Sequence, residues 1–209
     1  MKKYEFTGET KTVPLLFGDV TLHRIQAITS FANVVAGELG GWIEKEENLS
    51  HKGGAWVCGN ACVYGNARVY GNARVYDEAC VCDDARVYGD AWVYGNACVY
   101  GNAWVYGNAC VYGNARVYGN ARVYDEACVC GNAEVFSANH VLVIGAIGSR
   151  SAFTTFFRDK DNEIAVKCGC FSGKIDEFLE KVVQTHGDSK YAQVYKKAVE
   201  LAKLQILTD

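Results

Sequence analysis

Ala67-Arg68-Val69-Tyr70-Gly71-Asn72 is one copy of a six-residue unit that fills the middle of this chain. A valine stands at every sixth position from Val57 to Val141, fifteen in all, and alanine stands two residues before each valine from Ala55 to Ala133. In an extended segment alanine and valine point to one side, and the residues after them point to the other. Gly-Asn then supplies a tight corner, because both residues tolerate a positive φ.

A unit of six residues is too short for a helix or for a hairpin. The chain must therefore coil, with short strands stacked in parallel and with alanine and valine buried along the axis. Such a lopsided repeat, in a chain that is 50% hydrophobic, excludes a disordered protein and predicts a β-solenoid.

The spacing of a branched aliphatic residue and a small residue resembles the hexapeptide-repeat, left-handed parallel β-helix proteins, over residues 55–142. In that family three hexads form one triangular coil of eighteen residues, and the proteins are commonly trimers. The resemblance therefore implies a mainly β fold with five regular coils, about 24 Å long at ~4.8 Å per strand.

Taking every eighteenth residue gives three outer faces of paired rows. One carries Arg68, Arg86, Trp104, Arg122 and His140 beside Tyr70, Tyr88, Tyr106, Tyr124 and Leu142. Another carries Trp56, Arg74, Trp92, Cys110 and Cys128 beside Cys58, Tyr76, Tyr94, Tyr112 and Cys130, and the third carries Cys62, Cys80, Cys98, Arg116 and Glu134 beside Tyr64, Cys82, Tyr100, Tyr118 and Phe136. Outward aromatic surface of this extent predicts association, so we expect a homo-oligomer, with a trimer favoured by the resemblance.

Both ends of the chain depart from the repeat. Residues 1–54 are expected to form an irregular N-terminal cap, with Ile43 and Leu49 indicating one degenerate coil. Residues 55–142 form the solenoid, and residues 143–209 are expected to form a small α+β module. In it we expect a hairpin of residues 152–158 and 163–170, a helix with Ser172 as its N-cap, and a second helix capped by Asp188.

The whole chain also resembles open reading frames common in phages and prophages. These combine a segment like Leu39-Gly40-Gly41-Trp42-Ile43-Glu44, a Tyr-Gly-Asn-Ala solenoid, and a tail like Gly148-Ser149-Arg150 with Lys167-Cys168-Gly169-Cys170-Phe171-Ser172-Gly173. That resemblance implies a phage role but brings no assigned chemistry.

Charge and hydropathy exclude several classes of partner. Lys plus Arg number 21 against 24 Asp plus Glu, for a formal net charge of -3, which argues against binding a polynucleotide or an anionic membrane through bulk charge. The first residues hold no apolar leader segment, and no run of eighteen apolar residues follows. We expect a cytoplasmic location, the host cytoplasm if the protein is phage-encoded, and reduced thiols for the ten cysteines.

Catalysis and metal binding receive little support. Many enzymes with a resembling solenoid transfer acyl groups from coenzyme A with a histidine base, but here the hexads run without an inserted loop and His140 is the only histidine in register. A carbonic-anhydrase-like zinc site would need three convergent histidines. The histidines are scattered instead, at His23, His51, His140 and His186.

Paired cysteines suggest a soft-metal site, and acidic corners suggest calcium. The pairs are Cys80 with Cys82, Cys128 with Cys130, and Cys168 with Cys170. However, the block from Gly65 to Cys82 recurs at Gly113 to Cys130, a shift of 48 that is not a multiple of eighteen, so its copies fall on different faces. We interpret the cysteines as structural and the corners Asp77-Glu78, Asp83-Asp84 and Asp125-Glu126 as solvated surface, with no metal or cofactor expected.

Anion binding is the strongest positive hypothesis. Arg68, Arg86 and Arg122 share one row, with Tyr88 and Tyr106 alongside, a layout that can pair phosphate oxygens and stack a base. The alternative is that these arginines solubilise the tyrosine rows.

The tail offers further anion-binding candidates. The stretch from Gly145 to Arg150, with Gly148 and Ser149, could form a backbone N–H nest beside the arginine, and Ser172-Gly173 at a helix N-terminus could seat a phosphate. Thr154, Thr155 and Arg158 lie nearby in sequence. The alternative is that these glycines only form turns.

The sequence therefore predicts a non-enzymatic, oligomeric binding protein of phage or prophage type that sequesters a nucleotide-like anionic small molecule, such as a host defence signal. A structural or protein-interaction rod is the first alternative, and an acyltransferase-like enzyme is the second.

Overall fold

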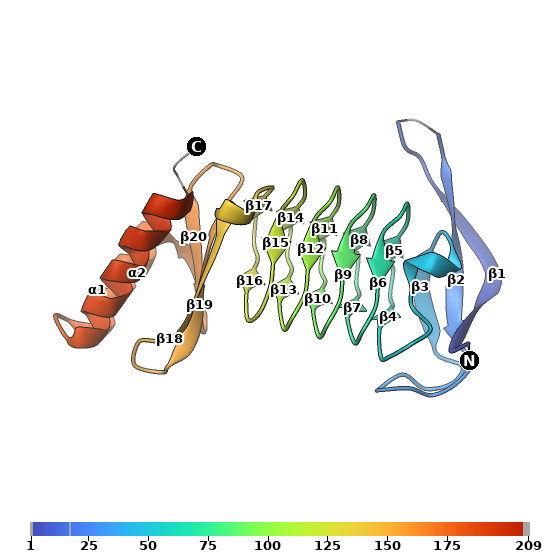
Figure 1. Ribbon diagram of the computed structural model, residues 1–209, viewed down its shortest axis with the longest axis horizontal. Coiled ribbons are helices and arrows are strands. Elements are labelled where there is room, and N and C mark those ends of the chain that lie inside the picture. The colour runs from blue at the N-terminus through green and yellow to red at the C-terminus, as the bar shows by residue number, and fades with distance from the viewer. Residues whose placement is uncertain (1, 17, 207–209) are drawn as a thin grey trace.

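The computed structural model describes residues 2–16 and 18–206. Figure 1 shows a row of stacked coils with an antiparallel cap at its N-terminal end and a sheet with two helices at its C-terminal end. The coils consist of two-residue strands. They are β4 (Trp56–Val57), β5 (Cys62–Val63), β6 (Arg68–Val69), β7 (Arg74–Val75), β8 (Cys80–Val81), β9 (Arg86–Val87), β10 (Trp92–Val93), β11 (Cys98–Val99), β12 (Trp104–Val105), β13 (Cys110–Val111), β14 (Arg116–Val117), β15 (Arg122–Val123), β16 (Cys128–Val129) and β17 (Glu134–Val135).

Each strand from β4 to β14 pairs in parallel with the strand three hexads further along. Arg68 pairs with Arg86, Trp104 pairs with both Arg86 and Arg122, and the valines pair in the same register. The strands thus form three sheets, ordered β4-β7-β10-β13-β16, β6-β9-β12-β15, and β5-β8-β11-β14-β17. The eighteen-residue coil implied by the resemblance to hexapeptide-repeat proteins is confirmed.

Alanine and valine fill the inside of every coil. Each of them from Ala55 to Val135 is at most 1% exposed. The backbone amides bind the next coil along the axis, as in the bond from Tyr70 N to Val87 O of 3.1 Å. Burial of a valine stabilises the fold by roughly 1.5 kcal/mol or more, so the regular stack carries most of the core.

The corners need a left-handed backbone. Repeat glycines have φ between 60° and 74°, and where aspartate replaces glycine, at Asp77, Asp83 and Asp125, φ is also positive. The Asp77 and Asp83 carboxylates accept hydrogen bonds from Gly95 N at 3.2 Å and Gly101 N at 3.0 Å in the next coil. Two of the acidic corners therefore bind neighbouring backbone.

The N-terminal cap extends one of the three sheets. Strand β1 (Tyr4–Val13) pairs antiparallel with β2 (Val20–Ala27), which pairs antiparallel with β3 (Leu39–Ile43), and β3 pairs in parallel with β5. A short 3-10 helix, η1 (Glu46–Asn48), follows. Leu49 then bridges to Val69, and Ile43 pairs with Val63, so both residues predicted for the degenerate coil pair with residues of the regular coils.

One residue predicted on an outer face is buried by this cap. Trp56 is 1% exposed, and its ring lies 5.5 Å from the ring of Phe31 and 6.3 Å from that of Tyr4. The prediction for Trp56 was wrong because the first coil is covered by the N-terminal segment rather than by solvent.

The fifteenth hexad is not a coil. Residues Ala138–His140 form a second 3-10 helix, η2, and Val141 begins strand β18. His140 is 1% exposed and Leu142 lies in β18, so neither continues the row predicted for it.

The C-terminal module is a four-stranded antiparallel sheet with two helices. The strands are β18 (Val141–Ile147), β19 (Ala152–Arg158), β20 (Ile164–Cys168) and β21 (Phe171–Lys174), in that order, followed by α1 (Ile175–His186) and α2 (Lys190–Ile206). The predicted hairpin is confirmed as β19 and β20. Helix α1 begins two residues later than expected, with Lys174 rather than Ser172 at its N-cap, and α2 begins two residues after Asp188.

Strand β19, an inner strand of this sheet, is buried on both faces. Phe157 belongs to the core of the solenoid, whereas Phe156 belongs to the core beneath the helices. Thr155 Oγ1 accepts a hydrogen bond of 3.0 Å from Cys128 N and so covers the end of one solenoid sheet.

Among the described residues, neither helix is long and apolar enough to span a membrane.

Replacing corner glycines tests whether neighbouring coils restrain the corners. Gly89→Ala would place a Cβ 2.9 Å from Gly107 N of the next coil, whereas Gly131→Ala, with a similarly positive φ, meets nothing within 4 Å. Both variants bear the left-handed strain of about 1 to 2 kcal/mol. We expect Gly89→Ala to lose a further ~1 to 3 kcal/mol of unfolding free energy in urea. Equal losses of unfolding free energy in Gly89→Ala and Gly131→Ala would contradict a contact between neighbouring coils at Gly89.

Candidate functional site

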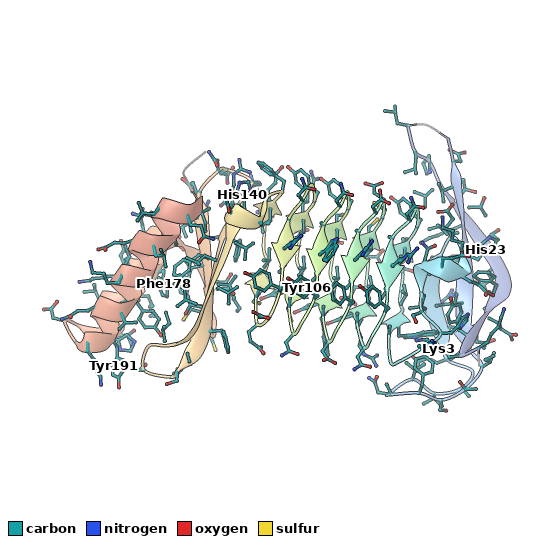
Figure 2. The ribbon with its side chains drawn as sticks, in the orientation of Figure 1. Lys3, His23, Tyr106, His140, Phe178 and Tyr191 are labelled. Atoms are coloured by element: carbon teal, nitrogen blue, oxygen red, sulfur yellow. The ribbon has the colours of Figure 1, made fainter. Side chains whose placement is uncertain are left out.

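The first face is the outward side of β6, β9, β12 and β15. Its two rows are Arg68, Arg86, Trp104 and Arg122, and Tyr70, Tyr88, Tyr106 and Tyr124. The tyrosine rings stack at centroid distances of 4.8, 5.0 and 5.5 Å. Figure 2 shows Tyr106 on this face and His140 near the C-terminal end of the solenoid. The structure therefore brings the five predicted residues of this face together.

The inner rings of the row have no face left for a ligand. Tyr88 is parallel to Tyr70 on one side and to Tyr106 on the other, within 3° in both cases. Tyr106 is stacked between Tyr88, at an interplanar angle of 3°, and Tyr124, at 15°. Both faces of the Tyr88 and Tyr106 rings are therefore covered by neighbouring rings, which leaves no ring face of either residue for a base to stack on.

Trp104 is enclosed similarly. The guanidinium groups of Arg86 and Arg122 lie 5.0 and 5.1 Å from its ring centroid, one from the coil on each side. These cation–π contacts hold the two arginines in the row and leave the edges of their guanidinium groups as donors.

Tyr70 ends the row on the N-terminal side. Ser50 N donates to Val69 O at 2.9 Å, the same bond that Tyr70 N makes to Val87 O one coil later. Ser50 therefore occupies the position before Tyr70, but it carries no ring. We call the space above Ser50 and beside Tyr70 the vacant rung.

The vacant rung opens into a cavity of about 490 Å³. The cavity is lined by Glu46, Glu47, Leu49, Ser50, His51, Arg68, Val69, Tyr70 and Arg86. It thus combines an aromatic ring, two guanidinium groups and two carboxylates. Sequence reasoning named Tyr70 only as a member of the row, and it missed Ser50 because the spacing from Leu49 to Val57 breaks the hexad.

The wall opposite Tyr70 is fixed by buried polar contacts. Asn48 is fully buried, and its amide donates to Gly65 O at 3.1 Å and to Ala67 O at 2.9 Å. Tyr4 Oη donates to Leu49 O at 2.8 Å. Because η1 is attached both to the first coil and to the cap, the cavity is preformed.

The charges of the cavity are unevenly matched. Glu46 is paired with Lys2 at 2.5 Å, and this hydrogen bond holds the pKa of its carboxyl below the ordinary value. Among the described residues, no carboxylate lies within ion-pair distance of Arg68 or Arg86. The two arginines therefore remain available to an anion, and Glu47 remains available as an acceptor.

Two further hollows continue along the face. One of about 500 Å³ is lined by Lys45, Glu47, Asn48, Asn66, Ala67, Arg68, Asp84 and Arg86, and one of about 350 Å³ is lined by Asp84, Arg86, Asn102, Trp104, Asn120 and Arg122. Arg68 and Arg86 thus stand between the vacant rung and the first of these hollows, while Arg122 belongs to the far one.

The threonines predicted near a tail site are inaccessible. Thr154 is fully buried and donates to Cys168 Sγ at 3.2 Å, and Thr155, 1% exposed, caps the solenoid at Cys128. Their assignment as ligand-binding residues was wrong, because the strand that holds them is covered on both sides. Arg158 is also occupied, with its guanidinium 4.7 Å from the Phe136 ring centroid and Nε donating to Asn162 Oδ1 at 2.6 Å.

The predicted phosphate seat at a helix N-terminus is absent. Ser172 and Gly173 lie in β21, and Ser172 Oγ is 3.4 Å from Cys130 Sγ. The extended strand β18 also runs on to Ile147, so the expected nest from Gly145 is reduced to the turn of Gly148, Ser149 and Arg150. That turn borders a separate cavity.

The cysteines do not assemble into a metal centre. Among the described residues, no three His, Cys, Asp or Glu side chains converge as a metal site. Cys80 Sγ donates to Tyr64 Oη at 3.6 Å, and Cys128 Sγ to Tyr112 Oη at 3.8 Å. Burial raises the pKa of Cys128 to about 11, so this thiol stays protonated at neutral pH.

Comparison with known families supports the architecture. A family model described as the YdcK beta solenoid repeat matches residues 67–82, 79–95, 91–107, 109–125 and 115–131, all within the stacked coils. A search of curated proteins found no match. The chain is thus a β-solenoid repeat protein, similar in its coils to the YdcK repeat.

The tyrosine rows make the free energy of unfolding depend on pH in the alkaline range. Burial raises the pKa of Tyr76, and likewise of Tyr118, from 10.0 to about 12. A phenol whose pKa is raised by folding stabilises the fold below its unfolded pKa, and this contribution is lost as pH rises through the folded pKa. We expect unfolding free energy to fall between pH 10.0 and about 12, with phenolate absorbance rising late. Ionisation of these phenols at pH 10.0 in the folded protein would contradict their partial burial in the rows.

Proposed function

We propose that this protein binds a nucleotide-like anion at the vacant rung of the first face and holds it without chemical turnover. The observation that carries the proposal is the juxtaposition of one uncovered tyrosine face, on Tyr70, with the arginine pair Arg68 and Arg86 in a preformed cavity of about 490 Å³.

A planar base fits the vacant rung because it would continue an existing stack. The rings of this row repeat at 4.8 to 5.5 Å, and Ser50 leaves the next position empty of aromatic atoms. Stacking of a base on an aromatic side chain contributes about 1 to 3 kcal/mol. Tyr70 is held by Tyr88 behind it, so little ordering is needed on binding.

The anionic part of the ligand would lie against the arginines. Arg86 is braced by Trp104 and neither arginine is paired with a carboxylate among the described residues, so both can donate to phosphate oxygens. Glu47 lines the same cavity and can accept from a hydroxyl or an exocyclic amino group. The mixture of charges therefore favours a nucleotide over a bare phosphate.

Binding without turnover is supported by how the polar residues of the cavity are engaged. Ser50 Oγ donates to Lys52 O at 3.3 Å and accepts from Lys52 N at 3.0 Å. His51 stacks on Tyr4 at 4.3 Å, and its Nδ1 accepts from Lys3 N. Neither residue is arranged as a nucleophile with its base. His140, the only histidine in register with the repeat, is buried, which is a further observation in favour of binding without turnover.

The biological setting is part of the proposal. The chain resembles phage and prophage reading frames, and sequestration of a host nucleotide signal in the cytoplasm requires binding alone. A preformed site suits that purpose because little binding free energy is lost in ordering its residues when the ligand binds.

Ser50→Tyr should fill the vacant rung and block the site. We expect the wild-type chain to bind ADP in isothermal titration calorimetry, with ribose 5-phosphate, which lacks a base, binding at least about tenfold more weakly. Ser50→Tyr should weaken ADP binding by about tenfold or more, because its ring takes the place of the base. Tyr106→Leu is the matched control, since both faces of that ring are covered.

Two results would contradict the proposal. One is the absence of binding for ADP, ADP-ribose and cyclic nucleotides by the wild-type chain. The other is ADP binding that Ser50→Tyr leaves unchanged while Tyr106→Leu abolishes it.

A second candidate function is association through the second face, which we define as Arg74, Trp92, Cys110 and Cys128 with Tyr76, Tyr94 and Tyr112. Trp92 is 44% exposed in the middle of it, with its ring edge 5.9 Å from Tyr76. An exposed tryptophan on a flat aromatic row favours a partner surface, and we propose a homo-oligomer, with a trimer as the expected number of subunits.

Trp92→Arg should dissociate the oligomer. Sedimentation equilibrium of the wild-type chain should give a multiple of 22.9 kDa, and Trp92→Arg should shift it towards the monomer. Tyr124→Arg is the control, because Tyr124 is 43% exposed on the first face. A monomeric wild-type chain, or equal effects of both variants, would reject this interface.

A further inference from the structure

The C-terminal module contains a second cavity, of about 250 Å³, that is separate from the first face. It lies between the turn of residues 148–151, the turn at Gly169 and Cys170, and the helices α1 and α2. We propose that this cavity binds a compact organic anion with an apolar body, of the aromatic carboxylate class, independently of the nucleotide-like ligand.

The rim of the cavity is basic. Arg150 comes from the turn, and Lys181 and His186 come from α1. The residues that line the cavity include no Asp or Glu. Arg150 and Lys181 form no ion pair with a carboxylate of the described residues, and Lys181 Nζ instead donates to Gln184 Oε1 at 3.0 Å. Unpaired cations around one opening favour an anion.

The floor of the cavity is apolar and aromatic. Phe178, Val182 and Tyr195 are 3%, 4% and 6% exposed. The Phe178 ring meets Tyr195 edge-on at 5.4 Å, and Phe171 lies 5.3 Å from Phe178. Figure 2 shows Phe178 between the sheet and the helices. A floor of this kind accepts an aromatic or aliphatic body and offers nothing to a hydrated inorganic ion.

A glycine, Gly148, allows the turn that forms the rim to pack closely against the floor. Gly148 has φ +74°, and a Cβ at this position would collide with Tyr195 Oη. The turn that carries Arg150 therefore rests directly on the tyrosine of the floor. On the other side, Cys168 Sγ accepts from Thr154 Oγ1 at 3.2 Å. The arginine is thus presented over an apolar surface by packed backbone rather than by a free loop.

Size separates this site from the first one. Its volume of about 250 Å³ is near half that of the cavity at the vacant rung. Pockets for drug-sized ligands hold about 300 to 1,000 Å³. A single ring with a carboxylate matches the smaller cavity, whereas a nucleotide diphosphate exceeds it.

The test compares indole-3-carboxylate with indole-3-carboxamide, which has the same shape without the charge. By isothermal titration calorimetry of the full chain, we expect the carboxylate to bind and the amide to bind at least about tenfold more weakly. Arg150→Gln and Lys181→Gln should each weaken the carboxylate severalfold. Lys196→Gln is the matched control on α2, because Lys196 is exposed and does not line the cavity.

Three outcomes would overturn the proposal. They are no binding of the carboxylate, equal binding of carboxylate and amide, and binding that neither Arg150→Gln nor Lys181→Gln reduces. Ser50→Tyr should leave carboxylate binding unchanged, and its loss in that variant would place the anion on the first face instead. Each variant is checked by circular dichroism, and all three lysine and arginine changes are at exposed positions.

Discussion

The stacking of each residue on the residue eighteen positions later is the constraint from which the other features follow. It is imposed by backbone bonds between coils, such as that from Arg86 N to Ala103 O of 2.9 Å, and by corners whose backbone nearly touches the next corner. Alanine and valine then fill the inside of the regular coils. Within the regular coils, an outward side chain is flanked by the side chains at the equivalent position of the coils before and after it. The residue types along each row therefore determine the chemical character of that face.

Stacking also determines where binding is possible. A ring inside a row spends both faces on its neighbours, so a long aromatic row stiffens the solenoid without offering a platform. Ligands that stack can enter only where a row stops. On the first face it stops at Tyr70 and at Tyr124, and at Tyr70, where the irregular coil supplies Ser50, two arginines line the same cavity. The irregular end of the repeat, rather than its regular middle, is therefore the candidate site.

Sequence reasoning predicted the regular part because one repeated rule governs it. The row of Arg68, Arg86 and Arg122 followed from the repeat together with the eighteen-residue coil that the family resemblance implies. Trp56, Thr154 and Thr155 were assigned wrongly because their burial depends on how the caps fold over the ends of the solenoid, which no repeat records. The start of α1 was missed because Ser172 and Gly173 complete a sheet instead of opening a helix. Tyr70 became distinctive only when the bond from Ser50 to Val69 showed which position preceded it.

The most direct test of this account is a crystal structure of the chain grown with ADP. The account predicts an adenine ring parallel to Tyr70 on the side of Ser50, with the phosphates against Arg68 and Arg86. Adenine density on the outer face of Tyr124, between two inner rings of the row, or away from the first face altogether would contradict the claim that the vacant rung is the site.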